Sequence, residues 1–335
     1  MRKLLVIALT FCFVSADEFF EPKTTIGGYG EMHYDMEAND GDGKLDFHRF
    51  IVYYKHQFSP EWSMMSEVEI EHNMVGSESS LGYKGGYLAM EQAHLNYWNG
   101  SFGFKGGVIL VPAGIINEYH EPPTFMSVER PEYNKYIIPT TWFDNGFSLY
   151  GTKGDFNWNV TLTGDLDGDA IGAGIRGARL KGYYSKASSW TKTIQGSFTG
   201  VDGLKLGGSV TMNDAPKDDG TSVGVTLTEF NGTYYKNNMY ARMEYGMIDY
   251  TDNPVTDTSN GYYLDLGYNV AELVGCDGDM FVWTRTSNYT RDDVESIDIS
   301  LFGLTYKPLE NVSFKFELGS KNDADVMRFG LGYMF

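Results

Sequence analysis

Strict alternation of apolar and polar residues, repeated in segments of about ten residues, limits the fold of this chain more than any other feature. In residues 61–73 the apolar side chains of one face are Trp62, Met64, Val68 and Ile70. The opposite face carries serine and three glutamates. A period of two residues is the period of a β-strand with one apolar and one polar face.

Counting such segments along the chain predicts sixteen strands. We place them at 24–37, 45–57, 61–73, 87–98, 101–111, 143–151, 154–164, 189–200, 203–213, 221–235, 238–249, 260–271, 279–290, 295–307, 312–320 and 325–335. Residues 177–186 could form a further strand, but an odd number would break the parity, so they are assigned to a loop. Parity does not decide which face of 279–290 carries Trp283 and Arg285.

The connections between these segments alternate in length. Short turns such as TKGDF and YKNNM carry Pro, Gly or Asn, and longer acidic loops such as NDAPKDDG lie between them. Two connections are much longer, at 112–141 and 164–188. Tight turns on one side and long loops on the other are typical of an outer-membrane barrel. A soluble sandwich rarely has so many strands, and a solenoid would show a fixed repeat length.

The N-terminal residues predict a secretory signal peptide. Arg2 and Lys3 precede an apolar run at 4–14, and Ala16 ends a stretch of small residues. We expect cleavage after Ala16, which leaves a single barrel domain at 17–335 with 24 basic and 45 acidic residues and a net charge of -21, two charges below the full chain's -19. Such a charge argues against a nucleic-acid partner. Cleavage would also remove Cys12 and leave Cys276 without an intrachain disulfide partner.

No window after residue 16 is long and apolar enough for a transmembrane helix. A secreted chain of this kind is either soluble or spans a membrane as a closed barrel, because every backbone polar group in lipid must be paired. The alternation favours the barrel in the outer membrane of a bacterium, with lipid as its surroundings.

The final strand alternates up to the last residue, and its outward face ends on Tyr333 and Phe335. A last strand that closes on the first cannot fray, and aromatic residues suit the membrane interface. The ending resembles the C-terminal signal of outer-membrane barrel proteins. That resemblance implies recognition of Tyr333 and Phe335 by the barrel-insertion machinery.

Three stretches resemble the phosphate-selective porin O and P family of bacterial porins. They are GKLDFHRFIVYYKHQFSPEWSMMSEVEIE, LNYWNGSFGFKGGVILVPAGI and ERPEYNKYIIPTTWFDNGFSLYG. The resemblance implies a sixteen-stranded homotrimeric barrel with a third loop folded inward. Phosphate-selective members carry basic residues along the pore, and here the second strand keeps Arg49 and Lys55 while the third has glutamates. Fixed acidic charge favours cations or neutral solutes, so the alternative of an anion- or phosphate-selective porin stays open.

We predict that residues 112–141 fold into the lumen and constrict it, because long loops in compact folds usually carry function. The candidates on this loop are Glu118, His120, Glu121, Glu129, Arg130, Glu132 and Lys135. Parity predicts these lumen-facing wall residues: Arg49, Lys55, Glu67, Glu69, Glu71, Lys105, Arg242, Glu244, Lys315, Glu317 and Arg328. A basic wall opposite an acidic loop would set a transverse field across the pore.

No metal site, cofactor or catalytic group is predicted. The acidic stretch 39–46 fails the EF-hand spacing, and His48, His72 and His94 show no ligand spacing. No G-x-S-x-G motif is present, which argues against a hydrolase. The sequence therefore predicts a porin that lets small hydrophilic solutes or ions diffuse passively. A non-conducting adhesin or structural barrel is the alternative from another class.

Overall fold

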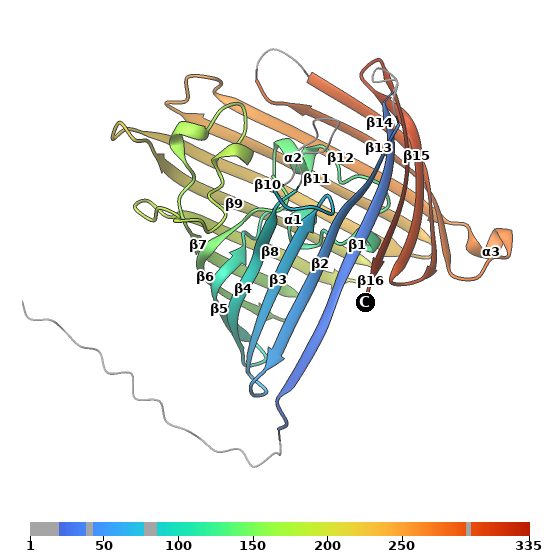
Figure 1. The fold of residues 1–335 in the computed structure, drawn as a ribbon, viewed down its shortest axis with the longest axis horizontal. Helices are drawn as coiled ribbons and strands as arrows, with labels where there is room; N and C mark the ends of the chain where they lie inside the picture. The colour runs from blue at the N-terminus through green and yellow to red at the C-terminus, as the bar shows by residue number, and fades with distance from the viewer. Residues whose placement is uncertain (1–19, 38–42, 77–85, 293–295) are drawn as a thin grey trace, which may run out of the picture.

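Sixteen antiparallel strands pair with their neighbours in sequence and close into a barrel, because β16 (Ala324–Met334) pairs with β1 (Lys23–Glu37) (Figure 1). The computed structural model describes residues 20–37, 43–76, 86–292 and 296–335. The expected signal peptide at 1–16 lies outside the described residues. The closed, all-antiparallel architecture predicted from the alternation is confirmed.

The other strands run consecutively around the barrel. They are β2 (Lys44–Gln57), β3 (Trp62–Glu71), β4 (Leu88–Trp98), β5 (Phe102–Leu110), β6 (Phe143–Lys153), β7 (Phe156–Thr163), β8 (Thr191–Val201), β9 (Leu204–Pro216), β10 (Ser222–Lys236), β11 (Met239–Thr251), β12 (Thr258–Asn269), β13 (Asp279–Thr290), β14 (Ser296–Leu309) and β15 (Val312–Lys321). Each predicted strand has its counterpart, with every boundary within three residues, and 177–186 forms no strand, as predicted.

On the short-turn side, the connection after β12 is not a tight turn. The predicted strand 260–271 ends at Asn269 because the Asn269 side chain accepts hydrogen bonds from Ala271 N (3.1 Å) and Met280 N (3.0 Å). A single helical turn, α3 (Ala271–Val274), then projects away from the strands (Figure 1). Elsewhere on this side the turns are tight. Asn237 and Asn238 both have positive φ, as a two-residue type I′ hairpin requires.

The alternation sorts side chains between two faces as the sequence indicated. Apolar residues such as Phe147, Phe302 and Phe316 point outward and are exposed on the isolated chain. Inward positions are polar in some strands and apolar in others. On β13 both Trp283 and Arg285 point inward and are buried, which settles the face that parity left open.

The C-terminal residue is fixed in the sheet. Phe335 N donates to Gly28 O at 2.9 Å, and Gly28 N donates to Phe335 O at 3.0 Å. The ring of Tyr333 covers Gly30 on β1, where an added Cβ would lie 2.6 Å from the Tyr333 hydroxyl. The last strand therefore closes the barrel to its final residue, as its alternation indicated.

An apolar core lies between the inward face of the barrel and the connection from β5 to β6. Ile116, Phe125 and Tyr133 of this connection cluster with inward side chains of later strands, including Ile248 and Trp283. The barrel interior is thus partly filled by its own chain.

Within the described residues no helix has the length and hydropathy needed to cross a membrane.

Candidate functional site

The connection from β5 to β6, residues 111–142, is here called loop 3. It contains two short helices, α1 (Ile115–Glu118) and α2 (Tyr133–Tyr136), and the 3₁₀ turn η1 (Pro122–Thr124). Most of its residues are buried. A buried loop needs partners for its backbone groups, and here the inward-facing charged side chains of the barrel supply them.

Glu244 on β11 anchors one end of loop 3. Its carboxylate accepts hydrogen bonds from Ile115 N (2.9 Å), Ile116 N (3.3 Å) and the Tyr263 hydroxyl (2.6 Å). A carboxylate that accepts several donors in a buried position makes strong, charge-assisted bonds. The start of α1 is therefore fixed to the wall formed by β11 and β12.

The strands next to the barrel closure hold the middle of the loop. Glu317 on β15 accepts a hydrogen bond from Val128 N at 2.8 Å. Lys315 on the same strand donates to Pro122 O (2.6 Å) and Ser127 O (2.8 Å). Both charged side chains were predicted to line a lumen. They point inward but bond the loop backbone and are almost fully buried.

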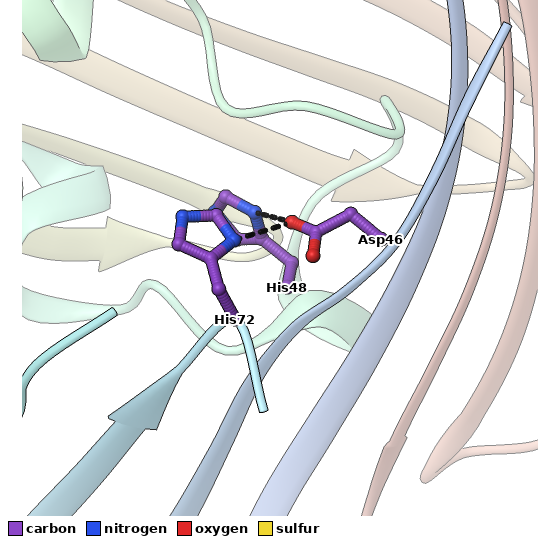
Figure 2. Close-up of side chains that lie close together, drawn as sticks. All are labelled: Asp46, His48 and His72. Atoms are coloured by element: carbon purple, nitrogen blue, oxygen red, sulfur yellow. Dashed lines mark hydrogen bonds and ion pairs between the residues drawn. The ribbon is translucent and has the colours of Figure 1, made fainter. Parts of the chain in front are cut away.

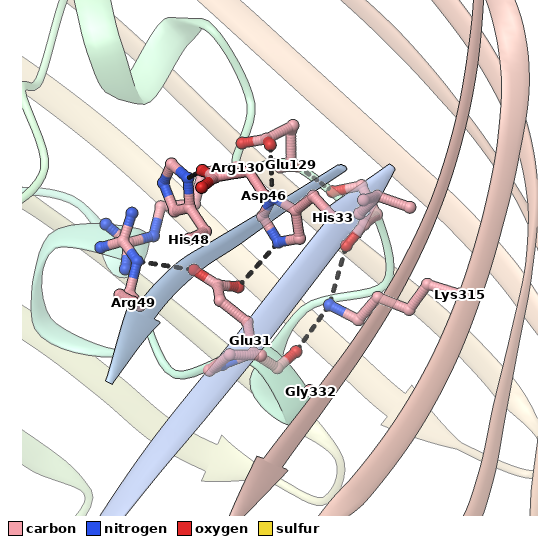
Figure 3. Close-up of polar contacts among 12 residues, drawn as sticks. Glu31, His33, Asp46, His48, Arg49, Glu129, Arg130, Lys315 and Gly332 are labelled. Carbon is pink, nitrogen blue, oxygen red and sulfur yellow. Dashed lines mark hydrogen bonds and ion pairs between the residues drawn. The ribbon is translucent and has the colours of Figure 1, made fainter. Parts of the chain in front are cut away.

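On β1, the His33 side chain connects loop 3 to a row of charged side chains on the wall (Figure 3). Its imidazole lies 2.5 Å from Glu129 and 3.1 Å from Glu31, and Glu31 lies 2.6 Å from Arg49. Burial alone would raise the pKa of the Glu129 carboxyl, but the neighbouring His33 holds that pKa well below its usual range. Glu129 therefore remains ionised and pairs the loop with β1.

Of the remaining predicted loop residues, Glu121 and Glu132 reach the wall, whereas Arg130 and Lys135 contact the loop itself. Glu121 accepts from the Tyr53 hydroxyl (3.3 Å), and Glu132 accepts from Tyr289 (2.7 Å) and Lys321 (2.7 Å). Arg130 donates back to a loop carbonyl, His120 O, at 3.1 Å. Lys135 lies 5.2 Å from the ring of its neighbour Tyr136. His120 points toward β3 and β4.

The predicted wall residues all come from inward positions, but they fall into two groups. Lys55 is exposed, and Lys105 and Glu71 are partly exposed. The others are buried beneath loop 3 or paired with one another: Arg49, Glu67, Glu69, Arg242, Glu244, Lys315, Glu317 and Arg328. Arg242, for example, donates to the loop carbonyl Thr124 O at 2.9 Å. Parity could not indicate that loop 3 lies over the buried members of this set.

Loop 3 leaves polar side chains partly exposed on the side of β5 to β9. Glu118, at the end of α1, accepts a hydrogen bond from Gln195 on β8 at 2.7 Å. Burial raises the pKa of the Glu118 carboxyl, and Gln195, Lys205 and Lys105 partly oppose that rise. Lys205 on β9 lies 5.2 Å from the ring of Tyr119, which is half exposed. An acidic loop residue thus faces two lysines of the wall here.

Two cavities are rich in basic residues. One of about 620 Å³ lies at the turn side and is lined by Lys23, Lys55 and Lys105 with Glu21 as its acidic residue. The other, of about 300 Å³, lies against loop 3. It is lined by the basic residues Arg49, Arg130, Lys135, Arg176, Arg285, Lys321 and Arg328, and by the acidic residues Asp35, Glu129 and Glu132. The overall acidic charge of the chain therefore does not describe these two cavities.

A cluster that the sequence did not reveal lies at the loop end of β2 and β3. The Asp46 carboxylate lies 3.1 Å from His48 Nδ1 and 2.6 Å from His72 Nδ1 (Figure 2). His72 has a positive φ and its backbone N donates to His48 O at 3.0 Å. The three side chains are partly exposed, and each pair of ring nitrogen and carboxylate oxygen is already hydrogen-bonded.

Sequence reasoning also missed residues whose partners come from other strands. Arg285 on β13 forms a bidentate pair with Asp265 on β12, at 2.6 and 2.7 Å, with both side chains buried. Lys205 and Gln195 were on predicted strands, but nothing in their local pattern showed that they face Glu118. These contacts depend on which residues of different segments lie opposite one another, and the alternation within one strand does not contain that information.

Solved structures of bacterial outer-membrane proteins have the same fold. The Salmonella typhi OmpF complex with daunomycin matches with a TM-score of 0.65 at 10% identity, covering 93% of this chain and 97% of that one. The anion-selective porin of Comamonas acidovorans gives 0.64 at 11% identity, covering 94% and 100%. This chain has the sixteen-stranded porin fold. A loop-deletion form of Vibrio cholerae OmpT gives 0.62 at 13% identity, covering 94% and 99%.

Sequence comparison is less specific. No protein-family profile matches the chain. An uncharacterized protein of Aquifex aeolicus (strain VF5) is 29% identical over 352 residues, covering 93% of this chain and 80% of that protein. The resemblance to the phosphate-selective porin O and P family therefore stays a prediction, while the porin fold is established.

Proposed function

We propose that this protein is a channel of the bacterial outer membrane through which small hydrophilic solutes or ions diffuse. The observation that carries the proposal is the closed barrel with an apolar outer face and a charged inner face partly filled by loop 3. Such a barrel satisfies its backbone in lipid and encloses polar side chains. Homotrimeric assembly is part of the proposal, supported by the trimer form of the fold relative Vibrio cholerae OmpT.

We place the narrow part of the path between loop 3 and the wall of β5 to β9. Glu118 stands on the loop side, and Lys105 and Lys205 stand on the wall side. Opposite charges across a water-filled gap set a transverse field, and charge in a narrow lumen selects ions. The predicted constriction loop thus retains this role, carried by Glu118 rather than by all seven predicted loop residues.

A preference for anions is the second candidate, and the two basic cavities favour it. Several of their cations are neutralised by pairing, such as Arg285 by Asp265 and Lys321 by Glu132. Lys55 and Lys105 are not seen in ion pairs among the described residues. They would draw anions toward the path even though the whole chain is acidic.

The test is single-channel conductance in a planar bilayer, with the reversal potential measured under a KCl gradient. Conductance with anion preference supports both proposals, and Lys105→Gln should then reduce that preference while Glu118→Gln increases it. Lys153→Gln, at the exposed end of β6, is the matched control and should change neither. Conductance with cation preference would refute the anion candidate alone. A folded barrel that does not conduct would refute the channel and favour the adhesin or structural alternative.

A further inference from the structure

Three buried side chains from separate segments converge beneath loop 3. They are Glu67 on β3, Glu91 on β4 and His120 on the loop. His120 Nε2 lies 3.5 Å from Glu67 Oε1 and 3.7 Å from Glu91 Oε2. None of the three residues is more than 2% exposed. These groups therefore meet in a place that bulk water does not reach.

The converging atoms lack hydrogen-bond partners. Among the described residues, Glu67 Oε1, Glu91 Oε2 and His120 Nε2 are all buried without a hydrogen bond. Their separations of 3.5 and 3.7 Å exceed the usual hydrogen-bond range of about 2.7–3.2 Å. Leaving one buried polar atom unpaired is costly, so three that point at one another need a common partner.

The opposite atom of each group is held by a neighbour. Gln92 donates to Glu67 Oε2 at 2.6 Å, and the Thr141 hydroxyl donates to Glu91 Oε1. His120 Nδ1 lies 3.2 Å from the carbonyl of Asn117. Metal-bound histidines characteristically donate their second ring nitrogen to a carbonyl or carboxylate, and metal-bound carboxylates are likewise hydrogen-bonded. The supporting contacts of a metal site are thus present.

A β-bulge brings the two carboxylates to the same face. The β3–β4 register shifts after the pair Glu67–Gln92, because Val68 pairs with Met90. Glu91 is the extra residue of the bulge and points inward and buried, although Gln92 beside it also reaches Glu67. Bulges commonly re-aim a side chain at a functional site.

We propose that Glu67, Glu91 and His120 bind a divalent transition-metal ion of the zinc class, which fastens loop 3 to the wall. Ligand atoms about 2.0–2.1 Å from a tetrahedral Zn²⁺ lie roughly 3.4 Å apart, close to the observed separations. Two carboxylates and one imidazole suit Zn²⁺ and its first-row neighbours. Two carboxylate charges also match one divalent cation.

Tyr29 offers a further oxygen next to this set. Its ring packs edge-on against His120, with centroids 6.1 Å apart, and its buried hydroxyl has no hydrogen-bond partner among the described residues. The cluster of Asp46, His48 and His72 differs in each respect. It is partly exposed, and the Nδ1 atom of each histidine is already bonded to the carboxylate (Figure 2). Exposed histidine pairs also take up transition metals, so the experiment must separate the two places.

The test starts from a His48→Ala, His72→Ala background that removes the two histidines of the partly exposed cluster. This protein is refolded with Zn²⁺ because the buried site is not open to solvent, then passed through a desalting column, and bound zinc is measured by elemental analysis. We expect about one ion per chain, as one donor set predicts. Glu91→Gln or His120→Gln should weaken retention by more than about 100-fold, since even outer partners are worth about 10–100-fold. Glu118→Gln, a loop carboxylate outside the cluster, is the matched control.

X-ray absorption of the zinc-loaded background protein gives a readout that needs no substitution in the buried site. One imidazole with oxygen ligands is expected, and two imidazoles would place the ion elsewhere. Absence of retained zinc in the folded background protein would overturn the proposal. So would zinc retention that Glu91→Gln and His120→Gln leave unchanged. In either case bound protons and the positive charge of Arg130, which interacts electrostatically with Glu67, would neutralise the two carboxylates in place of a metal ion.

Discussion

The anchoring of loop 3 by Glu244 gives a prediction whose size follows from the geometry. Glu244→Ala removes the acceptor of Ile115 N, Ile116 N and the Tyr263 hydroxyl. Hydrogen bonds to charged groups contribute about 1.5–3 kcal/mol each. The bond to the Tyr263 hydroxyl joins two strands of the wall, so only the bonds from Ile115 N and Ile116 N hold the loop. The bond from Ile116 N is long at 3.3 Å, and water can enter the lumen, so we count each of these two bonds at the lower value. The loop should then lose about 3 kcal/mol of docking free energy, using that lower value.

The assay is hydrogen exchange of the loop amides in the folded barrel. A loss of about 3 kcal/mol corresponds to roughly 100-fold faster exchange through local opening. Asp265→Asn is the matched control, because Asp265 is a buried carboxylate on the adjoining strand that bonds Arg285 and not the loop. Unchanged exchange at Ile115 in Glu244→Ala would refute the reasoning. Equal acceleration in all strands would show that the barrel, and not the loop, depends on Glu244.

Three further outcomes are expected. Glu129→Gln should remove the acid sensitivity of loop docking. Because the pKa of Glu129 is lowered in the folded protein, its carboxylate stabilises the docked loop above pH 4.5, and this stabilisation is lost as the pH falls toward the folded pKa. Hydrogen exchange of the loop amides, measured as a function of pH, checks this prediction. Asp265→Leu should lower the free energy of unfolding in urea by about 3–5 kcal/mol, and adding Arg285→Met should recover most of it. Deleting Phe335 removes both backbone bonds to Gly28, so vesicle insertion should slow, while deletion of exposed Leu273 should leave it unchanged.

The sequence predicts the barrel well because its information is local. Each strand repeats the period of two, and a one-residue slip would move a whole apolar face inward. In residues 312–320, Phe314 and Phe316 alternate with Lys315 and Glu317. This alternation therefore predicts both that the segment is a strand and which side chains point inward. The ambiguous strand was β13, where inward positions are themselves aromatic, because they pack against a loop rather than water.

The interior is predictable only in part. Parity shows that Glu244 points inward, but not that the Ile115 amide, 129 residues earlier, will meet it. The cluster around His120 was equally hidden, because a bulge in β4 turns Glu91 inward against the local alternation. A contact made by a loop with a distant strand leaves no periodic pattern, so sequence reasoning named His120 without its partners.

The position of loop 3 over the junction of β1 and β16 has a consequence for assembly. Glu129 bonds His33 on the first strand, Val128 bonds Glu317 on the penultimate one, and a side chain at Gly332 on the last would collide with Pro122. The loop is synthesised long before these final strands, yet this part of its docking surface is complete only after they have been synthesised. Loop 3 can therefore complete its contacts with β1, β15 and β16 only late in assembly. Any process that separates β1 from β16 must first break these contacts with the loop.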